Sequence, residues 1–316
     1  YSILPTLLFP LLHVAASVLP PLFILAVVGH ALRKVTTWRH LVLQVSGGVL
    51  LAAPLAVVLE TIAMVLIATA AITGLALQPG GQELLVTAST HLQDPTLLQD
   101  PGSFIHTLLT PAIIAAAFVL VAILIPLMEE AIKTIGVGLM ANRHPSLPEA
   151  VLWGLAAGAG FAIAEGLLNS TGALGAWLAT VVLRLGTTLL HCLTGALVGV
   201  AWYQLFTQQR WARGLGLYLA SVAIHGLWNG LAAVMAVLSV TVTGTGTDSS
   251  TQLPIALGTL TILFLLGVLA LGMVGGLAGL VAHARRQDHP SPGLSSEQTE
   301  ALAPKLAYGA IPESEE

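Results

Sequence analysis

The chain has 316 residues, of which 56% are hydrophobic and 8% are charged. An ordinary soluble domain cannot bury so much apolar material, so the composition excludes that class and predicts a polytopic membrane protein. The formal net charge of −4 adds little to this prediction, and we expect no nucleic-acid partner.

The apolar runs are long enough to span a bilayer, which takes about 20 mostly apolar residues. In chain order, seven runs qualify: 3–29, 41–73, 108–141, 150–168, 173–207, 214–240 and 253–283. The first run has no basic segment ahead of it and no small-residue cleavage site, so we interpret it as a retained helix rather than a signal peptide. The sequence therefore predicts an all-α membrane bundle of about seven transmembrane helices.

Two segments lack the character of a membrane span. Residues 78–107 are a predicted external loop, with a short interfacial helix expected over residues 83–91. Residues 285–316 are rich in Ser, Pro and Glu, a composition typical of disorder. We therefore predict one transmembrane domain over residues 1–284, with a motif-bearing core at 108–240, and a disordered tail after it.

The basic residues are distributed unevenly among the connections. Arg or Lys occupies the connection between the first two runs and every second connection after it, whereas the connections near 74–107, 169–172 and 241–252 contain neither. Because basic residues collect on the cytoplasmic side of short loops, we predict an external N-terminus and a cytoplasmic C-terminus.

Ionisable residues are few inside the predicted spans, where each is costly unless it faces a partner or water. They are His13, Glu60, Glu129, Glu130, Lys133, Glu165, Arg184, His191 and His225. At about 1.5 Å of rise per residue, Glu129, Glu165, His191 and His225 fall about 16 to 25 Å from the basic ends of their helices. Four consecutive helices are thus expected to place these groups in one layer, together with Asn229.

The remaining polar residues of the spans have simpler interpretations. Glu60 and His13 fall outside the predicted layer, and we interpret both as structural. Cys192 is the single cysteine, which excludes an intramolecular disulfide and a multi-thiolate zinc site. We expect it to fill a place that needs a small residue.

Spacing predicts that the polar residues of each helix share a face. The spacing is four positions from Glu129 to Lys133, from Phe161 to Glu165 and from His225 to Asn229. It is seven positions from Arg184 to His191. Glu130 lies about 100° around the helix from Glu129, so we expect one glutamate to react and its neighbour to brace it. Pro126 is expected to kink this helix and to free a backbone carbonyl.

Glycines four residues apart predict close packing between helices. Such pairs are Gly154 with Gly158, Gly195 with Gly199, Gly226 with Gly230, and Gly272 with Gly276.

The polar layer suits hydrolysis. A carboxylate and imidazoles in a partly dry site can hold a water, take its proton and stabilise the oxyanion that forms. Two neutral imidazoles and a carboxylate would also suit zinc with an open position for water, and the spacing does not decide between these mechanisms. The sequence lacks HExxH, GxSxG and a paired-Asp motif in the membrane, which weakens zincin-like, rhomboid-like and presenilin-like alternatives.

An ordered set of motifs resembles the PrsW family of intramembrane proteases, relatives of the CAAX-prenyl endopeptidases. The motifs are "EEAIK" at 129–133, "GAGFAIAEG" at 158–166, Arg184 followed by "HCLTGALVG" at 191–199, and "HGLWNG" at 225–230. They cover about the central third of the chain. One departure is Gly166, which follows Glu165 where the family frequently has asparagine.

The resemblance implies a multi-pass endopeptidase of a bacterial-type plasma membrane. Its expected partners are the lipid bilayer and a single-span membrane protein substrate, such as an anti-sigma factor, cut near the external face. By position, the implied catalytic residues are Glu129, Glu130, Glu165, His191, His225 and Asn229, with Lys133, Arg184 and Phe161 in support. We expect one of the two adjacent glutamates to be the general base, and a metal-dependent enzyme would bind Zn²⁺ through His191, His225 and Glu165.

Two other classes of protein stay open at this point. A proton-coupled transporter would also line a midplane path with Glu and His residues, and it requires a polar route to both faces. A non-catalytic membrane scaffold would keep the histidines for packing. A closed polar layer with a lateral opening would favour the protease.

Overall fold

The computed structural model describes residues 3–32, 35–92, 110–169, 177–244 and 249–288. Within these ranges the chain forms helices joined by short connections, without a β-strand, which confirms the predicted all-α class. In the same residues, seven helical stretches are long and apolar enough to cross a membrane, as predicted.

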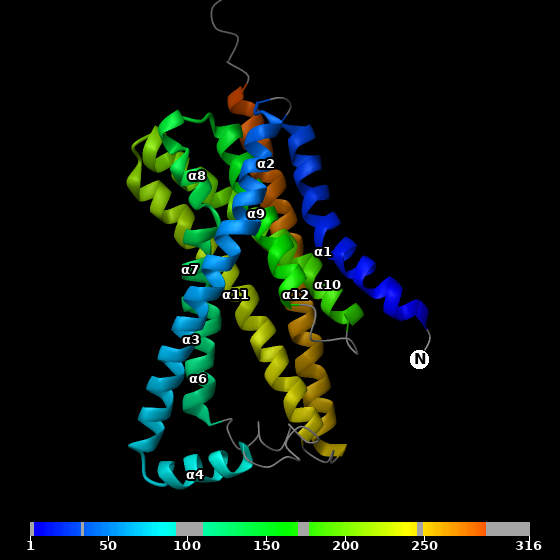
Figure 1. Ribbon diagram of the computed structural model, residues 1–316, viewed down its shortest axis with the longest axis vertical. Helices are drawn as coiled ribbons and strands as arrows, with labels where there is room; N and C mark the ends of the chain where they lie inside the picture. Colours follow the sequence, from blue (N-terminus) through cyan, green and yellow to red (C-terminus); the bar gives the residue numbers. More distant parts are fainter. Residues whose placement is uncertain (1–2, 33–34, 93–109, 170–176, 245–248, 289–316) are drawn as a thin grey trace, which may run out of the picture.

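The helices are arranged as an elongated bundle (Figure 1). Their bounds are α1 Ile3–Ala31, α2 Trp38–Gly47, η1 Gly48–Ala52, α3 Ala53–Ala76, α4 Gly81–Leu92, α6 Pro111–Val119, η3 Leu120–Leu124, α7 Ile125–Lys133, α8 Ile135–Leu139, η4 Ala141–Arg143, α9 Leu147–Asn169, α10 Trp177–Trp202, η6 Tyr203–Thr207, α11 Trp211–Gly244 and α12 Ser249–Asp288.

Some boundaries differ from those predicted. The second span is a continuous stretch of 39 residues, Trp38–Ala76, formed by α2, η1 and α3. Helix α12 continues to Asp288, past the predicted domain boundary at residue 284. The short helix predicted within the external loop is present as α4, which lies across one end of the bundle (Figure 1). The rest of that loop from residue 93 to 109, and the predicted tail from residue 289, lie outside the described residues.

Helix α9 is the central element of the bundle. Its membrane span is 83% buried, because α1, α2, α10 and α12 all pack against it. Glycines make the closest of these contacts, as predicted. A Cβ added at Gly158 would collide with the backbone carbonyl oxygen of His191, and one at Gly195 would lie 3.0 Å from the Cα of Gly158. The backbones of α9 and α10 therefore touch, and this contact fixes His191 directly beside α9.

The other predicted glycine pairs behave differently from each other. A Cβ at Gly226 would collide with the carbonyl oxygen of Ala122, and one at Gly230 would lie 3.2 Å from the ring of Phe118. Helix α11 thus packs closely against the α6–η3 segment. Close packing is not seen at the pair in α12, where a Cβ on Gly272 would meet no atom within 4 Å.

Single turns of π-helix interrupt the second and third spans at η1 and η3, and another one ends the fifth span at η6. The turn at η3 comes just before Pro126, which has no N–H and cannot bond the carbonyl of Ala122. Helix α11 covers the loosened backbone, because the side-chain amide of Asn229 donates to the carbonyl of Val121 at 3.3 Å. The π-turn lies about one turn before the adjacent glutamates, and the kink predicted from Pro126 stays a prediction.

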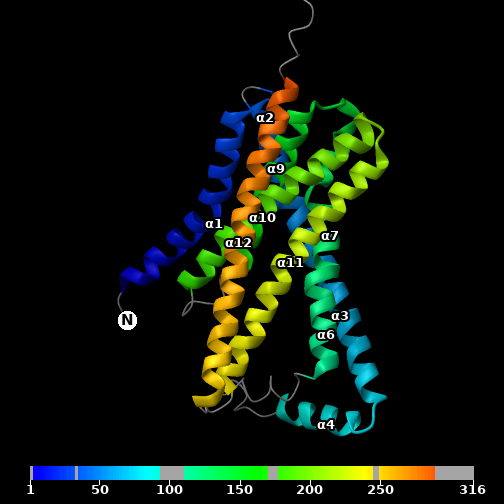
Figure 2. The ribbon, with the colours of Figure 1, turned by 180° about the vertical axis from the view of Figure 1, so that it is seen from behind.

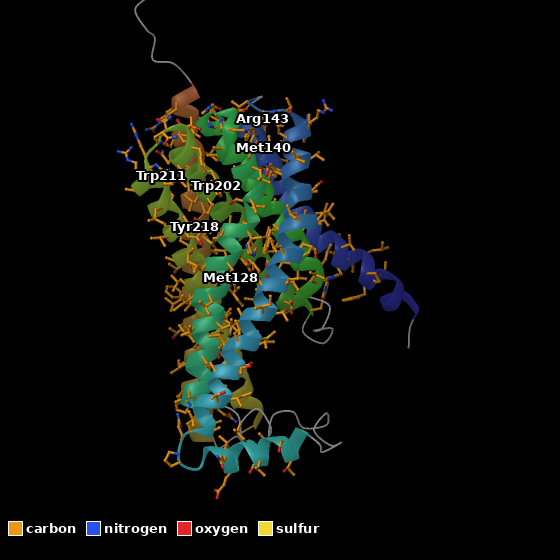
Figure 3. The ribbon with its side chains drawn as sticks, turned by 60° about the vertical axis from the view of Figure 1, so that its left-hand side comes forward. Met128, Met140, Arg143, Trp202, Trp211 and Tyr218 are labelled. Carbon is orange, nitrogen blue, oxygen red and sulfur yellow. The ribbon has the colours of Figure 1, made fainter. Side chains whose placement is uncertain are left out.

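The basic connections gather at one end of the bundle. Figures 1 and 2 show the end of α1, the starts of α2, α9 and α11, and the end of α12 together there. Figure 3 places Arg143 at the same end, with Trp202 and Trp211 near it. Arg285 in α12 donates to the carbonyl of Ala31 at 2.5 Å, which ties the last helix to the first. Clustering at one end agrees with the alternation in the sequence, while the orientation across the membrane stays a prediction.

Candidate active site

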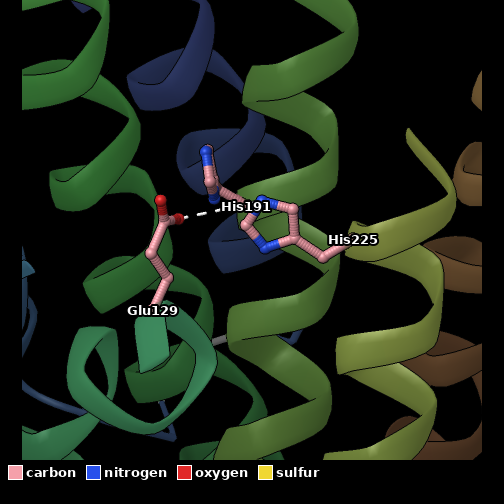
Figure 4. Close-up of side chains that lie close together, drawn as sticks. All are labelled: Glu129, His191 and His225. Carbon is pink, nitrogen blue, oxygen red and sulfur yellow. Dashed lines mark ion pairs between the residues drawn. The ribbon is translucent and has the colours of Figure 1, made fainter. Parts of the chain in front are cut away.

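Helices α7, α9, α10 and α11 bring the predicted polar layer together. Glu129, His191 and His225 are all buried, and one ligand atom from each lies within 4.8 Å of those of the other two. Figure 4 shows their side chains pointing toward one another from three helices. Residues almost 100 positions apart in the sequence thus meet in one site, as the depth estimates predicted.

Lys133 organises one side of the site. Its Nζ atom donates to Oε1 of Glu130 at 2.6 Å, to Nδ1 of His191 at 2.9 Å and to Oγ1 of Thr194 at 3.3 Å. Both charged side chains of the ion pair are fully buried. A lysine ammonium has three N–H donors and no acceptor, so these contacts use all of its hydrogen-bonding capacity. Spacing predicted a shared helix face for Lys133 and Glu129, and the ion pair of Lys133 is formed with Glu130 instead.

The lysine contact determines the tautomer of His191. Because an ammonium can only donate, Nδ1 of His191 accepts and its Nε2 carries the proton. That Nε2–H donates to Oε2 of Glu165 at 2.5 Å, and Arg184 binds Oε1 of Glu165 at 2.9 Å. Arg184 and His191 therefore share a face, as predicted. The ring of Phe161 lies 5.2 Å from the His191 ring, centroid to centroid.

His225 has the opposite tautomer. Its Nδ1 donates to Oε1 of Glu130 at 2.7 Å, which leaves the lone pair of Nε2 directed toward Oε2 of Glu129 at 3.7 Å. In the described part of the chain, Oε2 of Glu129 is buried and has no hydrogen-bond partner. The two adjacent glutamates thus occupy different surroundings: Glu130 anchors a lysine and a histidine, and Glu129 keeps an available oxygen.

A cavity of about 270 Å³ adjoins these residues between α3, the η3–α7 segment, α9 and α11. Its lining includes the polar side chains of Glu60, Glu129, Glu165 and Asn229 and the aromatic ring of Phe161. Asn229 lines the cavity while its amide is bound to the backbone of Val121. The catalytic role that the resemblance implies for Asn229 stays a prediction.

Glu60 was placed outside the polar layer by the sequence analysis, and this placement is wrong. Its carboxyl group lines the cavity and lies within hydrogen-bonding range of the carboxyl group of Glu129. Its helical stretch is 39 residues long and includes a π-turn, so position along the chain does not translate simply into depth. The sequence could have identified Glu60 as a site residue from its carboxylate alone. An ionisable residue inside a membrane span indicates a functional site by default.

Three other polar residues of the spans have packing roles or new partners. His13 bonds the carbonyl of Leu167 at 3.2 Å and so joins α1 to α9, in line with its structural interpretation. Cys192 is fully buried, as expected of a small core residue. Thr194, the third partner of Lys133, carries no sequence signal that distinguishes it from other threonines in a membrane helix.

The site has the donors that zinc uses. Two imidazoles and a carboxylate are a common zinc set, and Glu129, His191 and His225 approach one another closely enough to form it. Glu130 on the Nδ1 atom of His225 reproduces the carboxylate–histidine contact that orients metal ligands. The set predicted from the sequence had Glu165 in place of Glu129. In the structure Glu165 is engaged by Arg184 and His191, and the identity of the ligands stays a prediction.

A family model described as PrsW family intramembrane metalloprotease matches residues 85–266, which is more than half of the chain. No curated protein and no solved structure matches the chain. The matched segment contains Glu129, Glu165, His191 and His225, but not Glu60. The match identifies the protein as a peptidase, in preference to a transporter or a scaffold, and its seven apolar helices make it a multi-pass membrane protein. The chain belongs to the PrsW family of intramembrane metalloproteases.

Proposed function

We propose that this protein is an endopeptidase that hydrolyses a peptide bond in a single-span membrane protein, such as an anti-sigma factor. The observation that carries the proposal is the oxygen Oε2 of Glu129, which is buried without a hydrogen-bond partner in the described residues and adjoins a cavity beside His225. A water in this cavity would find an acceptor for its proton on Glu129 and the imidazole of His225 beside it. The proposed location is a bacterial plasma membrane.

Glu129 acts as the general base in this mechanism. Glu130 is unsuited to that role because Lys133 and His225 already bond one of its oxygens, and its side chain is fully buried. The unbonded oxygen of Glu129 takes the proton of the attacking water, while Nε2 of His225 accepts a second hydrogen bond that orients this water. Glu130 brings His225 into that orientation through its Nδ1–H.

The donor set fits a zinc ion, and Glu129 and His225 are the residues best placed to hold it. A bound zinc ion would acidify a coordinated water and polarise the scissile carbonyl. Glu129 has two oxygens, so one can contact the ion while the other receives a proton. Asn229, if released from the backbone of Val121, would donate to the developing oxyanion.

The decisive experiment compares wild type and Glu129→Gln on a panel of doubly tagged single-span membrane proteins, including an anti-sigma factor, in detergent or liposomes. We expect Glu129→Gln to lower the cleavage rate by roughly 10²- to 10⁴-fold, because it removes a general base without changing the size of the side chain. Glu83→Gln is the matched control, since Glu83 is exposed on α4, and it should cleave like wild type. Chelator treatment of the wild type tests the metal in the same assay.

The outcomes separate clearly. Cleavage that is unchanged by Glu129→Gln in a folded protein would contradict the assignment of the base. Wild-type cleavage that survives complete metal removal would make the enzyme a glutamate-dependent protease without zinc.

A further inference from the structure

Carboxylates and basic residues are unequal in number around the cavity. Glu130 and Glu165 each form an ion pair with a basic residue of the site, at 2.6 and 2.9 Å. Glu60 and Glu129 form none with Lys or Arg among the described residues. Because a charge inside a membrane protein is costly unless it is compensated, two adjacent carboxylates without a basic partner call for a cation.

The two carboxylates also face the same space. Both line the cavity, and their carboxyl groups lie within hydrogen-bonding range of each other. Glu129 is 6% exposed, and its Oε2 atom has no hydrogen-bond partner in the described structure. A volume of about 270 Å³ accommodates an ion with several waters. When both carboxyl groups are ionised, their two negative charges match the charge of a divalent cation.

One imidazole lies beside Glu129, next to the cavity. Nε2 of His225 presents a lone pair to Glu129, because its Nδ1–H is held by Glu130. His191 does not offer an equivalent donor in this arrangement, since its Nε2 proton is directed to Glu165. The donors that line the cavity and have no Lys or Arg partner among the described residues are therefore the carboxylates of Glu60 and Glu129, and the imidazole of His225 supports the site through Glu129.

We propose that Glu60 is a cation-binding residue of this enzyme and that it holds a divalent metal ion together with Glu129, with waters of the cavity completing the coordination. The proposal rests on the proposed function in that this cavity is also where the substrate is hydrolysed. Glu60 lies outside residues 85–266, so the family pattern does not assign it a role. Its helix is nevertheless held against the site. A Cβ at Gly48, in the π-turn before α3, would lie 2.7 Å from the backbone nitrogen of Phe161 on α9.

The test is a zinc titration of the full chain, purified in detergent and stripped of metal, for wild type, Glu60→Gln and Glu83→Gln. We expect wild type to bind one zinc ion at the site and Glu60→Gln to bind it roughly 10- to 100-fold more weakly, the loss typical when a group supporting a metal site is removed. Glu83→Gln, which neutralises an exposed glutamate in the first turn of α4, should bind zinc like wild type. Added zinc should raise the melting temperature of wild type more than that of Glu60→Gln.

Each outcome decides the proposal. Equal zinc affinity in wild type and Glu60→Gln would overturn it, and so would a wild type that binds no zinc. In either case, cleavage by the wild type would leave the proposed peptidase function standing. Zinc binding that depends on Glu60, without cleavage of any single-span protein, would instead support the metal site and remove the proposed function.

Discussion

The buried ammonium of Lys133 links the two halves of the site. It joins Glu130 on its own helix to His191 and Thr194 on α10, and Glu130 in turn bonds His225 on α11. Because every N–H of the ammonium has an acceptor, the tautomers of both histidines follow from this one group. Lys133 is thus a positioning residue, and its effect reaches the reacting groups through their ring nitrogens.

Replacing Lys133 by methionine should destabilise the protein strongly. The change leaves the buried carboxylate of Glu130 without its positive partner, and breaking a buried pair in this way costs about 3–5 kcal/mol. The measurement is the free energy of unfolding in a denaturant titration. The double variant Glu130→Gln with Lys133→Met, in which neither charge remains, should recover part of that loss. If the single and double variants are equally destabilised, the cost comes from packing and not from the unpaired charge.

The residues that form the site were largely predictable from the sequence, while their hydrogen-bond and ion-pair partners were not. The estimated depths in four helices correctly predicted that Glu129, Glu165, His191 and His225 lie together. The estimate works because a regular helix rises by a constant distance per residue. The partner of Lys133 was missed because residues three and four positions away are both neighbours on a helix surface. The contact with α10, which the sequence does not reveal, directs the lysine toward Glu130.

At the scale of elements, the contact between α9 and α10 determines how Glu165 and His191 lie relative to each other. Glu165 is on α9 and His191 is on α10. Oε2 of Glu165 and Nε2 of His191 lie 2.5 Å apart because glycines allow the backbones of the two helices to touch. The hydrophobic runs and the glycine spacing predicted both helices and their close packing. The π-turns were not predicted, since a single wide turn leaves the apolar pattern of a membrane helix almost unchanged.

Gly158→Ala should separate these two helices. Its methyl group would collide with the carbonyl oxygen of His191, and overpacking of this kind typically costs about 1–3 kcal/mol. We expect a lower free energy of unfolding and slower cleavage, because His191 moves relative to Glu165. Gly267→Ala on α12 is the matched control, since a Cβ there meets no atom within 4 Å, and both properties should stay near those of wild type. A fully active and stable Gly158→Ala would show that the helix contact is not restrictive.

At the scale of the whole molecule, the bundle has one basic end and one end crossed by α4. This asymmetry follows from the sequence, where Arg and Lys alternate between connections. Whether the basic end faces the cytoplasm depends on insertion into a membrane, which helix packing does not encode.

Cysteine labelling in intact cells should reveal the orientation. Ala212 at the start of α11 and Gln82 in α4 are both exposed, and they lie at opposite ends of the bundle. A membrane-impermeant maleimide should label Gln82→Cys in intact cells and Ala212→Cys only after the membrane is opened. The native Cys192 is fully buried and serves as an internal blank. The reverse labelling pattern would mean that the bundle is inserted the other way round.

Because α3 forms part of the cavity wall, it also limits how far this enzyme can be truncated. Residues 85–266 carry the family pattern, yet α1, α2 and α3 precede them and α12 extends beyond them. A fragment cut to the pattern would strip α9 of two of the helices that shield it and would open the cavity on the side of Glu60. The smallest autonomous enzyme is therefore larger than the segment by which its family is recognised.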